Sequence, residues 1–208
     1  MMAFDRGQER TDTGITDRLA DLSRDGYCGG MKMNVGDVKS KCSIRGRVAF
    51  VLAIAEQFVE SLKYSEKVYS LATKALDDAW KWEVGEQISG DQLDYYLENP
   101  EEESLAVYEC MAPEELKPGF VAITSALAYV AWQAYKKDGI KRMSDSIHQV
   151  SETVIDQVVD FAKKSPGFDV PFVDCIAKYL VEKCGSSTRD GLGEPIAKAS
   201  LMKAWRNQ

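Results

Sequence analysis

From residue 43 onward, the apolar residues of this chain recur at steps of three and four. The first run places one stripe on a helix and consists of Val48, Leu52, Ala55, Val59 and Leu62. The next run has the same spacing and consists of Val68, Ala72, Ala75, Ala79 and Trp82. No segment shows strand alternation of useful length, so the pattern predicts an all-α fold. A chain of 208 residues with 45% hydrophobic content is long enough for one substantial core.

Capping residues, glycines and prolines divide this pattern into helices. Ser65 can cap a helix that Gly85 ends, and Ser89 with Gln92 forms a capping box for a short helix that ends before Pro100. We therefore predict a single-domain multi-helix bundle of about five long helices plus short ones. The expected helices are 48–62, 65–84, 89–99, 101–110, 119–137, 144–164, 171–184 and 195–205.

Residues 1–42 lack this periodicity. The segment is rich in Gly, Asp and Arg, and its only helical candidate is the short stretch 15–22. The sequence thus predicts an irregular N-terminal arm over 1–42 and an all-helical domain over 43–208.

The acidic side chains are concentrated between Asp77 and Glu115. This stretch contains thirteen carboxylates and one cation, Lys81, so its net charge is −12, whereas the net charge of the whole chain is −7. The remainder is therefore net positive by five. Five aromatic residues lie among the acids: Trp80, Trp82, Tyr95, Tyr96 and Tyr108. Aromatic side chains anchor protein interfaces and an acidic field accelerates encounter with a basic partner, so the stretch predicts a surface for a basic protein.

Local structure accounts for part of this acidity. Carboxylates are favoured at helix starts, and this applies to Asp91, Asp94 and the three glutamates at 101–103. Trp82 falls on a core stripe, so Trp80 is the better candidate for exposure. The residues that we predict to contact a partner are Trp80, Asp91, Asp94, Tyr95, Glu98, Glu101, Glu102 and Glu103.

The residue types offer little for catalysis or metal binding. His148 is the single histidine, and Asp145 three residues before it gives only two of the three or four ligands that a metal site needs. The five cysteines are scattered, which fits neither a disulfide framework nor a zinc site. Paired carboxylates catalyse hydrolysis when a cleft drives their pKa values apart, whereas a charge run is usually a solvated face. We predict no catalytic residue, no metal and no cofactor.

Nucleic acid and membrane are also unexpected partners. A net charge of −7 lacks the concentrated basic face that phosphates require. The longest apolar run, 120–135, is interrupted by Thr124, Ser125 and Gln133, and the first residues lack the apolar stretch of a secretory signal peptide. We expect a cytoplasmic protein.

Three segments carry a family resemblance. Residues 75–82 read ALDDAWKW, residues 89–99 read SGDQLDYYLEN, and residues 128–135 read AYVAWQAY. In order and spacing they resemble the Imm6-type immunity proteins of bacterial polymorphic toxin systems, over a region from about Val48 to Asp138. The resemblance implies an all-α, non-catalytic protein that binds and neutralises a toxin made beside it.

The sequence therefore predicts an immunity protein that blocks a cognate toxin domain through an acidic aromatic surface. The acidity suits a basic, nuclease-like toxin. Two alternatives remain: a helical scaffold or adaptor without a toxin, and a hydrolase that depends on buried carboxylates.

Overall fold

The computed structural model of the protein describes residues 35–99, 104–184 and 189–206, and these fall within one compact unit. All regular structure in these three ranges is helical, which confirms the predicted all-α bundle. Glu101, Glu102, Glu103 and most of the expected arm lie outside the described residues.

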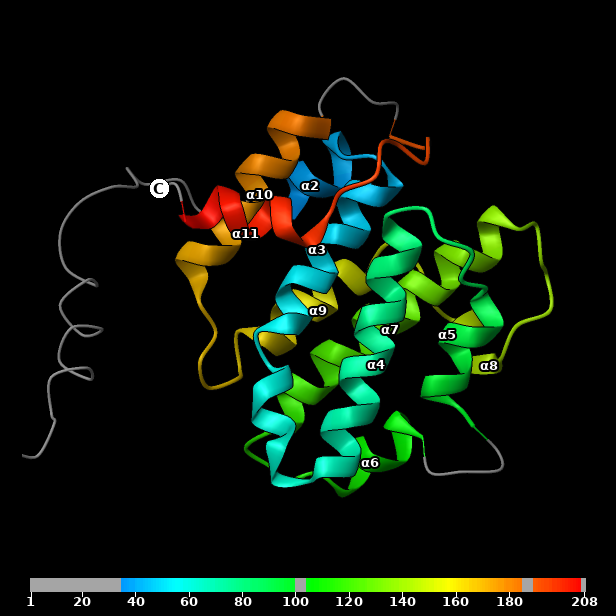
Figure 1. Ribbon diagram of the computed structural model, residues 1–208, viewed down its shortest axis with the longest axis vertical. Coiled ribbons are helices and arrows are strands. Elements are labelled where there is room, and N and C mark those ends of the chain that lie inside the picture. Colours follow the sequence, from blue (N-terminus) through cyan, green and yellow to red (C-terminus); the bar gives the residue numbers. More distant parts are fainter. Residues whose placement is uncertain (1–34, 100–103, 185–188, 207–208) are drawn as a thin grey trace, which may run out of the picture. The chain divides into compact units, whose positions relative to one another are not determined.

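Figure 1 shows how the helices of the described residues are arranged. They are α2 (Val35–Lys41), α3 (Ile44–Glu56), the 3₁₀ helix η2 (Val59–Tyr64), α4 (Glu66–Glu83), α5 (Gly90–Leu97), α6 (Leu105–Met111), α7 (Lys117–Lys137), α8 (Asp145–His148), α9 (Val154–Ala162), α10 (Val170–Cys184) and α11 (Lys198–Arg206).

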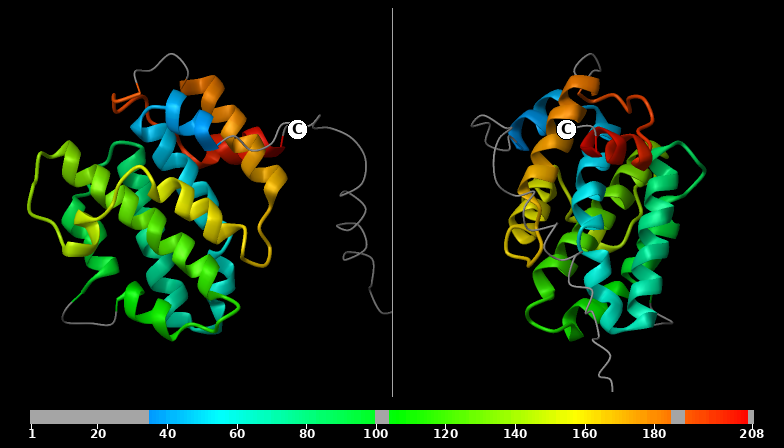
Figure 2. Two further views of the ribbon diagram at one scale, coloured as in Figure 1. Left: turned by 180° about the vertical axis from the view of Figure 1, so that it is seen from behind. Right: turned by 60° about the vertical axis from the view of Figure 1, so that its left-hand side comes forward.

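The long helix α7 lies at the centre of the bundle. It packs against α3, α4, α5 and α9, and its buried residues cover most of its circumference. From behind, α9 is seen to cross α7 and α3 (Figure 2). The nearly continuous apolar character of 120–135 thus reflects a core helix that has neighbours on several sides.

The predicted capping residues occupy their expected places. The side chains of Ser65 and Ser89 accept hydrogen bonds from the backbone of Val68 and Gln92, and the Ser89 capping box is complete. Gly85 follows α4 with a φ of +96°, a left-handed conformation that a side chain would strain. These residues fix where α4 ends and α5 begins, and so they position the acidic stretch.

Two predicted long helices are interrupted. The expected helix 48–62 changes at Gln57 into η2, and Phe58 at this junction stacks on Phe168, 6.4 Å between ring centroids. The expected helix 144–164 is two helices, because residues 149–153 form a turn between α8 and α9. Ser144 does cap a helix, but that helix is the four-residue α8.

The boundary predicted at residue 43 is too late. Helix α2 begins at Val35 and buries Val38 in the hydrophobic core, so part of the expected arm belongs to the helical domain. The apolar residues of this stretch are too few for periodicity to reveal a helix of seven residues. The stretch 1–34 lies outside the described residues.

Candidate functional site

Helix α5 presents an acidic aromatic stripe to solvent. The helix buries Leu93, Tyr96 and Leu97, which turns the opposite side outward. Asp91, Tyr95 and Glu98 are exposed and follow one another at steps of four and three, the spacing of one helix face. We call these three residues the α5 stripe.

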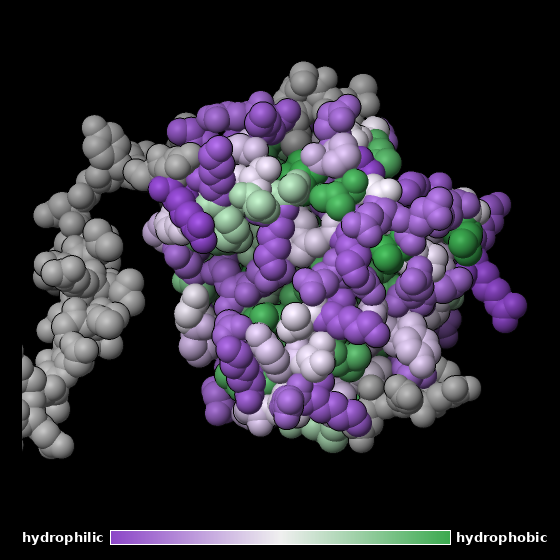
Figure 3. Space-filling model, viewed as in Figure 1, coloured by the Kyte–Doolittle hydropathy of each residue, from purple (hydrophilic) through white to green (hydrophobic). Residues whose placement is uncertain are grey.

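Tyr95 dominates this stripe because 51% of its surface is exposed. Asp77 on α4 and Glu86, between α4 and α5, are also exposed. Helices α4 and α5 lie on the face that Figure 1 presents, and hydrophilic side chains cover most of that face (Figure 3). The α5 stripe thus places one large aromatic ring in an acidic, well-hydrated surface.

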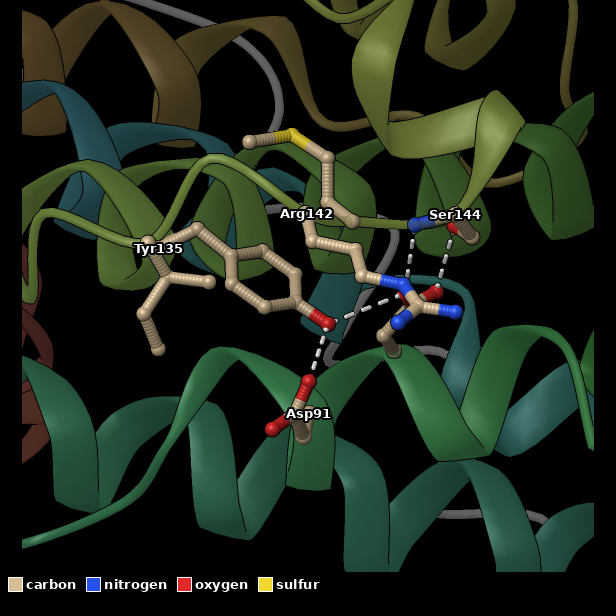
Figure 4. Close-up of a pocket in the computed structure, with 7 residues that line it drawn as sticks. Asp91, Tyr135, Arg142 and Ser144 are labelled. Atoms are coloured by element: carbon tan, nitrogen blue, oxygen red, sulfur yellow. Dashed lines mark hydrogen bonds between the residues drawn. The ribbon is translucent and has the colours of Figure 1, made fainter.

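A pocket of about 540 Å³ opens on one side of the stripe. Asp91 and Asp94 of α5 line one wall, Tyr135 of α7 lies beside them, and Ile140 with residues 142–144 forms the rest (Figure 4). We call it the α5–α7 pocket. It is open to solvent and combines both signs of charge with apolar side chains.

The Tyr135 hydroxyl connects the two carboxylates of this pocket. It lies 2.8 Å from Oδ1 of Asp91 and 3.1 Å from Oδ2 of Asp94, within donating distance of both (Figure 4). The ring comes this close because Gly90 has no side chain: a Cβ atom there would lie 2.6 Å from the Tyr135 ring. Gly90 and Tyr135 together fix the separation of α5 and α7.

Asp94 also connects α5 to the start of α8. The Ser144 hydroxyl donates to Oδ1 of Asp94 at 2.9 Å, and the Ser144 backbone N–H donates to Oδ2 at 3.4 Å. The same Ser144 hydroxyl accepts from Ile147 at the α8 N-terminus. Through these hydrogen bonds, Asp94 links α5 to α7 and to the start of α8.

Burial raises the pKa of Asp94 above its ordinary value, although the hydrogen bonds from Ser144 and Tyr135 act in the opposite direction. Burial together with the neighbouring Asp91 and Asp94 raises the pKa of Tyr135 as well, so its hydroxyl keeps its proton at neutral pH. The protonated Tyr135 hydroxyl can thus donate a hydrogen bond between the carboxyl groups of Asp91 and Asp94.

A smaller hollow of about 300 Å³ opens elsewhere along α5, where Asp91 and Gln92 lie with Tyr95, Tyr96 and Lys74. The Lys74 ammonium lies over the Tyr96 ring, 5.9 Å from its centroid. An aromatic surface of α5 thus already contacts a cation from α4.

The structure separates the predicted contact residues. Asp91, Tyr95 and Glu98 are exposed as expected. The expectation that Trp80 is exposed is wrong: the side chain is only 6% exposed, and its indole N–H donates to Glu56 at 3.0 Å. The core stripe of α4 is wider than the run 68–82 suggested, because α3 covers this face too.

Asp94 also differs from the expectation of a surface contact. It is 8% exposed, because its carboxylate turns toward Tyr135 and Ser144. The sequence did not identify Tyr135 or Arg142 as site residues, since Tyr135 reads as a core position and Arg142 belongs to no motif. Ser144 begins the expected helix 144–164, but the sequence did not reveal its bond to Asp94.

The described residues contain no group of three or more His, Cys, Asp or Glu side chains arranged to hold a metal ion. Cys42 and Cys175 are buried, whereas Cys110 is exposed. Across 35–99, 104–184 and 189–206, no helix has the length and apolar character that crossing a bilayer requires.

Comparison with known families places this geometry in context. Residues 46–165 match the family described as Immunity protein Imm6, which is more than half of the chain. The chain belongs to this family. The matched region runs from the first turn of α3 to just beyond α9 and includes the whole α5 stripe and the α5–α7 pocket. Helices α10 and α11 lie outside it.

Membership of the Imm6 family implies immunity against a bacterial toxin, and it confirms the resemblance carried by segments 75–82, 89–99 and 128–135. No curated protein and no solved structure matches the chain.

Proposed function

We propose that the protein binds a cognate toxin domain and neutralises it as a stoichiometric inhibitor, acting in the cytoplasm of the producing cell. The observation that carries this proposal is the α5 stripe, within a chain of an immunity family. Tyr95 supplies an exposed ring between Asp91 and Glu98. Half-exposed aromatic residues of this kind are enriched among the residues that dominate binding energy.

The charge distribution supports a basic partner. The stretch 77–115 carries a net charge of −12, and on α5 the acids of the stripe are directed to solvent. An acidic face raises the rate of encounter with a basic protein and orients it before contact. We therefore propose a basic, nuclease-like toxin domain whose substrate groove or active site this face covers. The glutamates at 101–103 would add charge at the rim.

One observation favours the hydrolase alternative: two carboxyl groups face a pocket, and burial raises the pKa of Asp94. However, both oxygens of Asp94 accept hydrogen bonds from Tyr135 or Ser144 that hold helix ends in place. A general acid must present its carboxyl group to a substrate, so the partners of Asp94 favour a structural role. We propose that the protein is not an enzyme.

Expression with the toxin encoded beside the gene tests the proposed function. The toxin domain should arrest growth when expressed alone, and co-expression of the protein should restore growth with the two proteins purifying as a complex. A scaffold without a toxin would restore nothing. A hydrolase would restore growth without forming a complex, and substitution of Asp91 by asparagine would abolish that rescue.

A further inference from the structure

The α5–α7 pocket contains two carboxylates and few donors for them. Tyr135 has one hydroxyl proton, so it can donate to Asp91 or to Asp94 but not fully to both. The remaining two donors, the hydroxyl and the N–H of Ser144, both serve Asp94. Within the described residues, the Asp91 side chain makes no other hydrogen bond, so its second oxygen has no protein donor, and Asp91 lines the pocket.

The walls around these carboxylates suit a long side chain that is apolar along its length. Ile140 and Met143 line the pocket together with the ring of Tyr135. The volume of about 540 Å³ can accommodate one large side chain of a partner without rearrangement of the helices.

Arg142 also lines the pocket, and in the view of Figure 4 its guanidinium group lies between the Tyr135 hydroxyl and Ser144. It is exposed and forms no ion pair in the described part of the chain. The cation is therefore near the carboxylates but is not fixed to them, and its flexible side chain can swing toward solvent.

We propose that the α5–α7 pocket receives an arginine side chain of the toxin, whose guanidinium group donates to Asp91 and whose stem packs on Tyr135 and Met143. This inference rests on the proposed function and specifies the chemistry of its central contact. A guanidinium group presents five donors in a planar fork, which suits a carboxylate with one oxygen that has no donor. The same group can also stack on a tyrosine ring. The pocket adjoins the α5 stripe, so an arginine seated there leaves Tyr95 and Glu98 free to contact the surrounding toxin surface.

Arg142 makes it possible to distinguish an incoming arginine from an incoming acidic side chain by the direction in which affinity changes. Arg142 repels an incoming arginine and Asp91 attracts it. Removing the charge of Arg142 should therefore strengthen binding, and removing the charge of Asp91 should weaken it. An incoming acidic side chain would pair with Arg142 and be repelled by Asp91, which reverses both effects.

The test compares four variants in titration calorimetry with the purified toxin domain that is encoded beside the gene. Asp91→Asn keeps an oxygen acceptor for Tyr135 and removes the charge, and Arg142→Ala removes the opposing cation. Glu182→Gln and Lys141→Ala are the matched controls, because both residues are exposed and neither lines the pocket. Thermal unfolding monitored by circular dichroism confirms that each variant is folded.

We expect Asp91→Asn to weaken the Kd about tenfold or more and Arg142→Ala to strengthen it about threefold, with both controls within about twofold of wild type. The opposite pair of changes would mean that the pocket receives an acidic side chain. An unchanged Kd in both pocket variants would mean that the pocket lies outside the interface. Either of these two results would overturn the arginine proposal and leave the proposed function intact. A wild-type protein that fails to bind the toxin would overturn the proposed function itself.

A second measurement needs no toxin. N-acetyl-arginine amide, titrated into the wild-type protein, should shift the NMR resonances of the Ser144 and Tyr135 amides, and N-acetyl-aspartate amide should not. The shifts should decrease in Asp91→Asn. Equal shifts with both compounds, or none with the arginine compound at concentrations of tens of millimolar, would contradict an arginine site.

Discussion

Asp94 and Tyr135 show how single residues hold the candidate site together. Asp94 is an almost fully buried carboxyl group, and its partners come from α7 and from the start of α8. Because burial raises its pKa above 3.8, the folded protein binds this proton more tightly than the unfolded chain does. The free energy of unfolding therefore falls as the pH rises from about 4 through the raised pKa.

Replacement of Tyr135 by phenylalanine should expose this linkage. The change removes a donor that lowers the pKa of Asp94, so the buried carboxylate becomes more costly in its charged form. We expect a loss of about 1–3 kcal/mol of unfolding free energy at pH 7 and a smaller loss at pH 4, where a larger fraction of Asp94 is protonated. Urea denaturation at the two pH values measures both.

Tyr95→Phe serves as the matched control, because the Tyr95 hydroxyl makes no hydrogen bond in the described part of the chain and the side chain is exposed. It should change stability by less than about 0.5 kcal/mol. An equal loss for Tyr135→Phe at pH 4 and pH 7 would show that the charge of Asp94 plays no part.

At the scale of the elements, capping decides where α5 lies. The helix has only eight residues, so its own propensity is too weak to form it alone. Its capping box and its packing on α7 therefore determine its position.

Ser89→Ala should destabilise the protein by about 1 kcal/mol, because it breaks the box that closes the first turn of α5. Ser104→Ala is the matched comparison: Ser104 also stands at an N-cap position, that of α6, but its side chain makes no capping bond. Thermal and urea unfolding of the two variants should rank them in this order. A larger effect at Ser104 would contradict the assignment of α5 stability to its cap.

The turn between α8 and α9 has a physical cause that periodicity could not reveal. Arg47 of α3 is buried, and its Nε atom lies 3.2 Å from Oε2 of Glu152. Tyr129 donates to the same carboxylate at 3.0 Å, and Gln133 donates to it at 3.3 Å. On a continuous helix with Ile147 and Val154 facing the core, residue 152 would point to solvent. The turn brings Glu152 inward.

Glu152→Ala should therefore cost about 2–3 kcal/mol of stability, because it leaves the Arg47 cation buried beside fewer acceptors. Asp160→Ala on α9 breaks an exposed pair with Lys163 and should cost less than about 0.5 kcal/mol. Urea denaturation provides the comparison. Similar small losses would show that Arg47 is adequately satisfied by the carbonyl oxygens of Cys42 and Arg189.

Sequence reasoning therefore succeeded where a signal was local and repeated. The bundle, the core helix α7 and the caps at Ser65 and Ser89 follow from spacing and from side-chain chemistry. The prediction that Trp80 is exposed was wrong because α3 packs against α4 and helps to bury that side chain. The periodicity of α4 alone does not reveal which of its faces another helix covers. The α5–α7 pocket was missed for the same reason, since Asp91, Tyr135 and Arg142 meet only through tertiary packing.

At the scale of the whole molecule, charge distribution governs how the protein would meet a partner. The net charge of −7 arises from one acidic stretch and an otherwise basic remainder along the sequence, and an uneven charge distribution of this kind can steer a charged partner. Acids on the α5 side should guide association with a basic toxin, while acids elsewhere should contribute little.

Glu98→Lys should slow association with the toxin domain and reduce its dependence on salt concentration, because it reverses a charge in the α5 stripe. Glu182→Lys reverses an exposed charge on α10 and should leave the association rate nearly unchanged. Stopped-flow association at several salt concentrations distinguishes them. Equal slowing by both variants would indicate that net charge alone matters.

The Kd of the complex between the toxin domain and Tyr95→Ala tests the central claim most directly. Tyr64→Ala is the control, because Tyr64 is 48% exposed and Tyr95 is 51% exposed, but Tyr64 lies on η2. If the α5 stripe is the binding surface, Tyr95→Ala should weaken the Kd about tenfold or more and Tyr64→Ala should leave it within about twofold. A Kd that is unchanged in Tyr95→Ala, or weakened only in Tyr64→Ala, would contradict the assignment of toxin binding to α5.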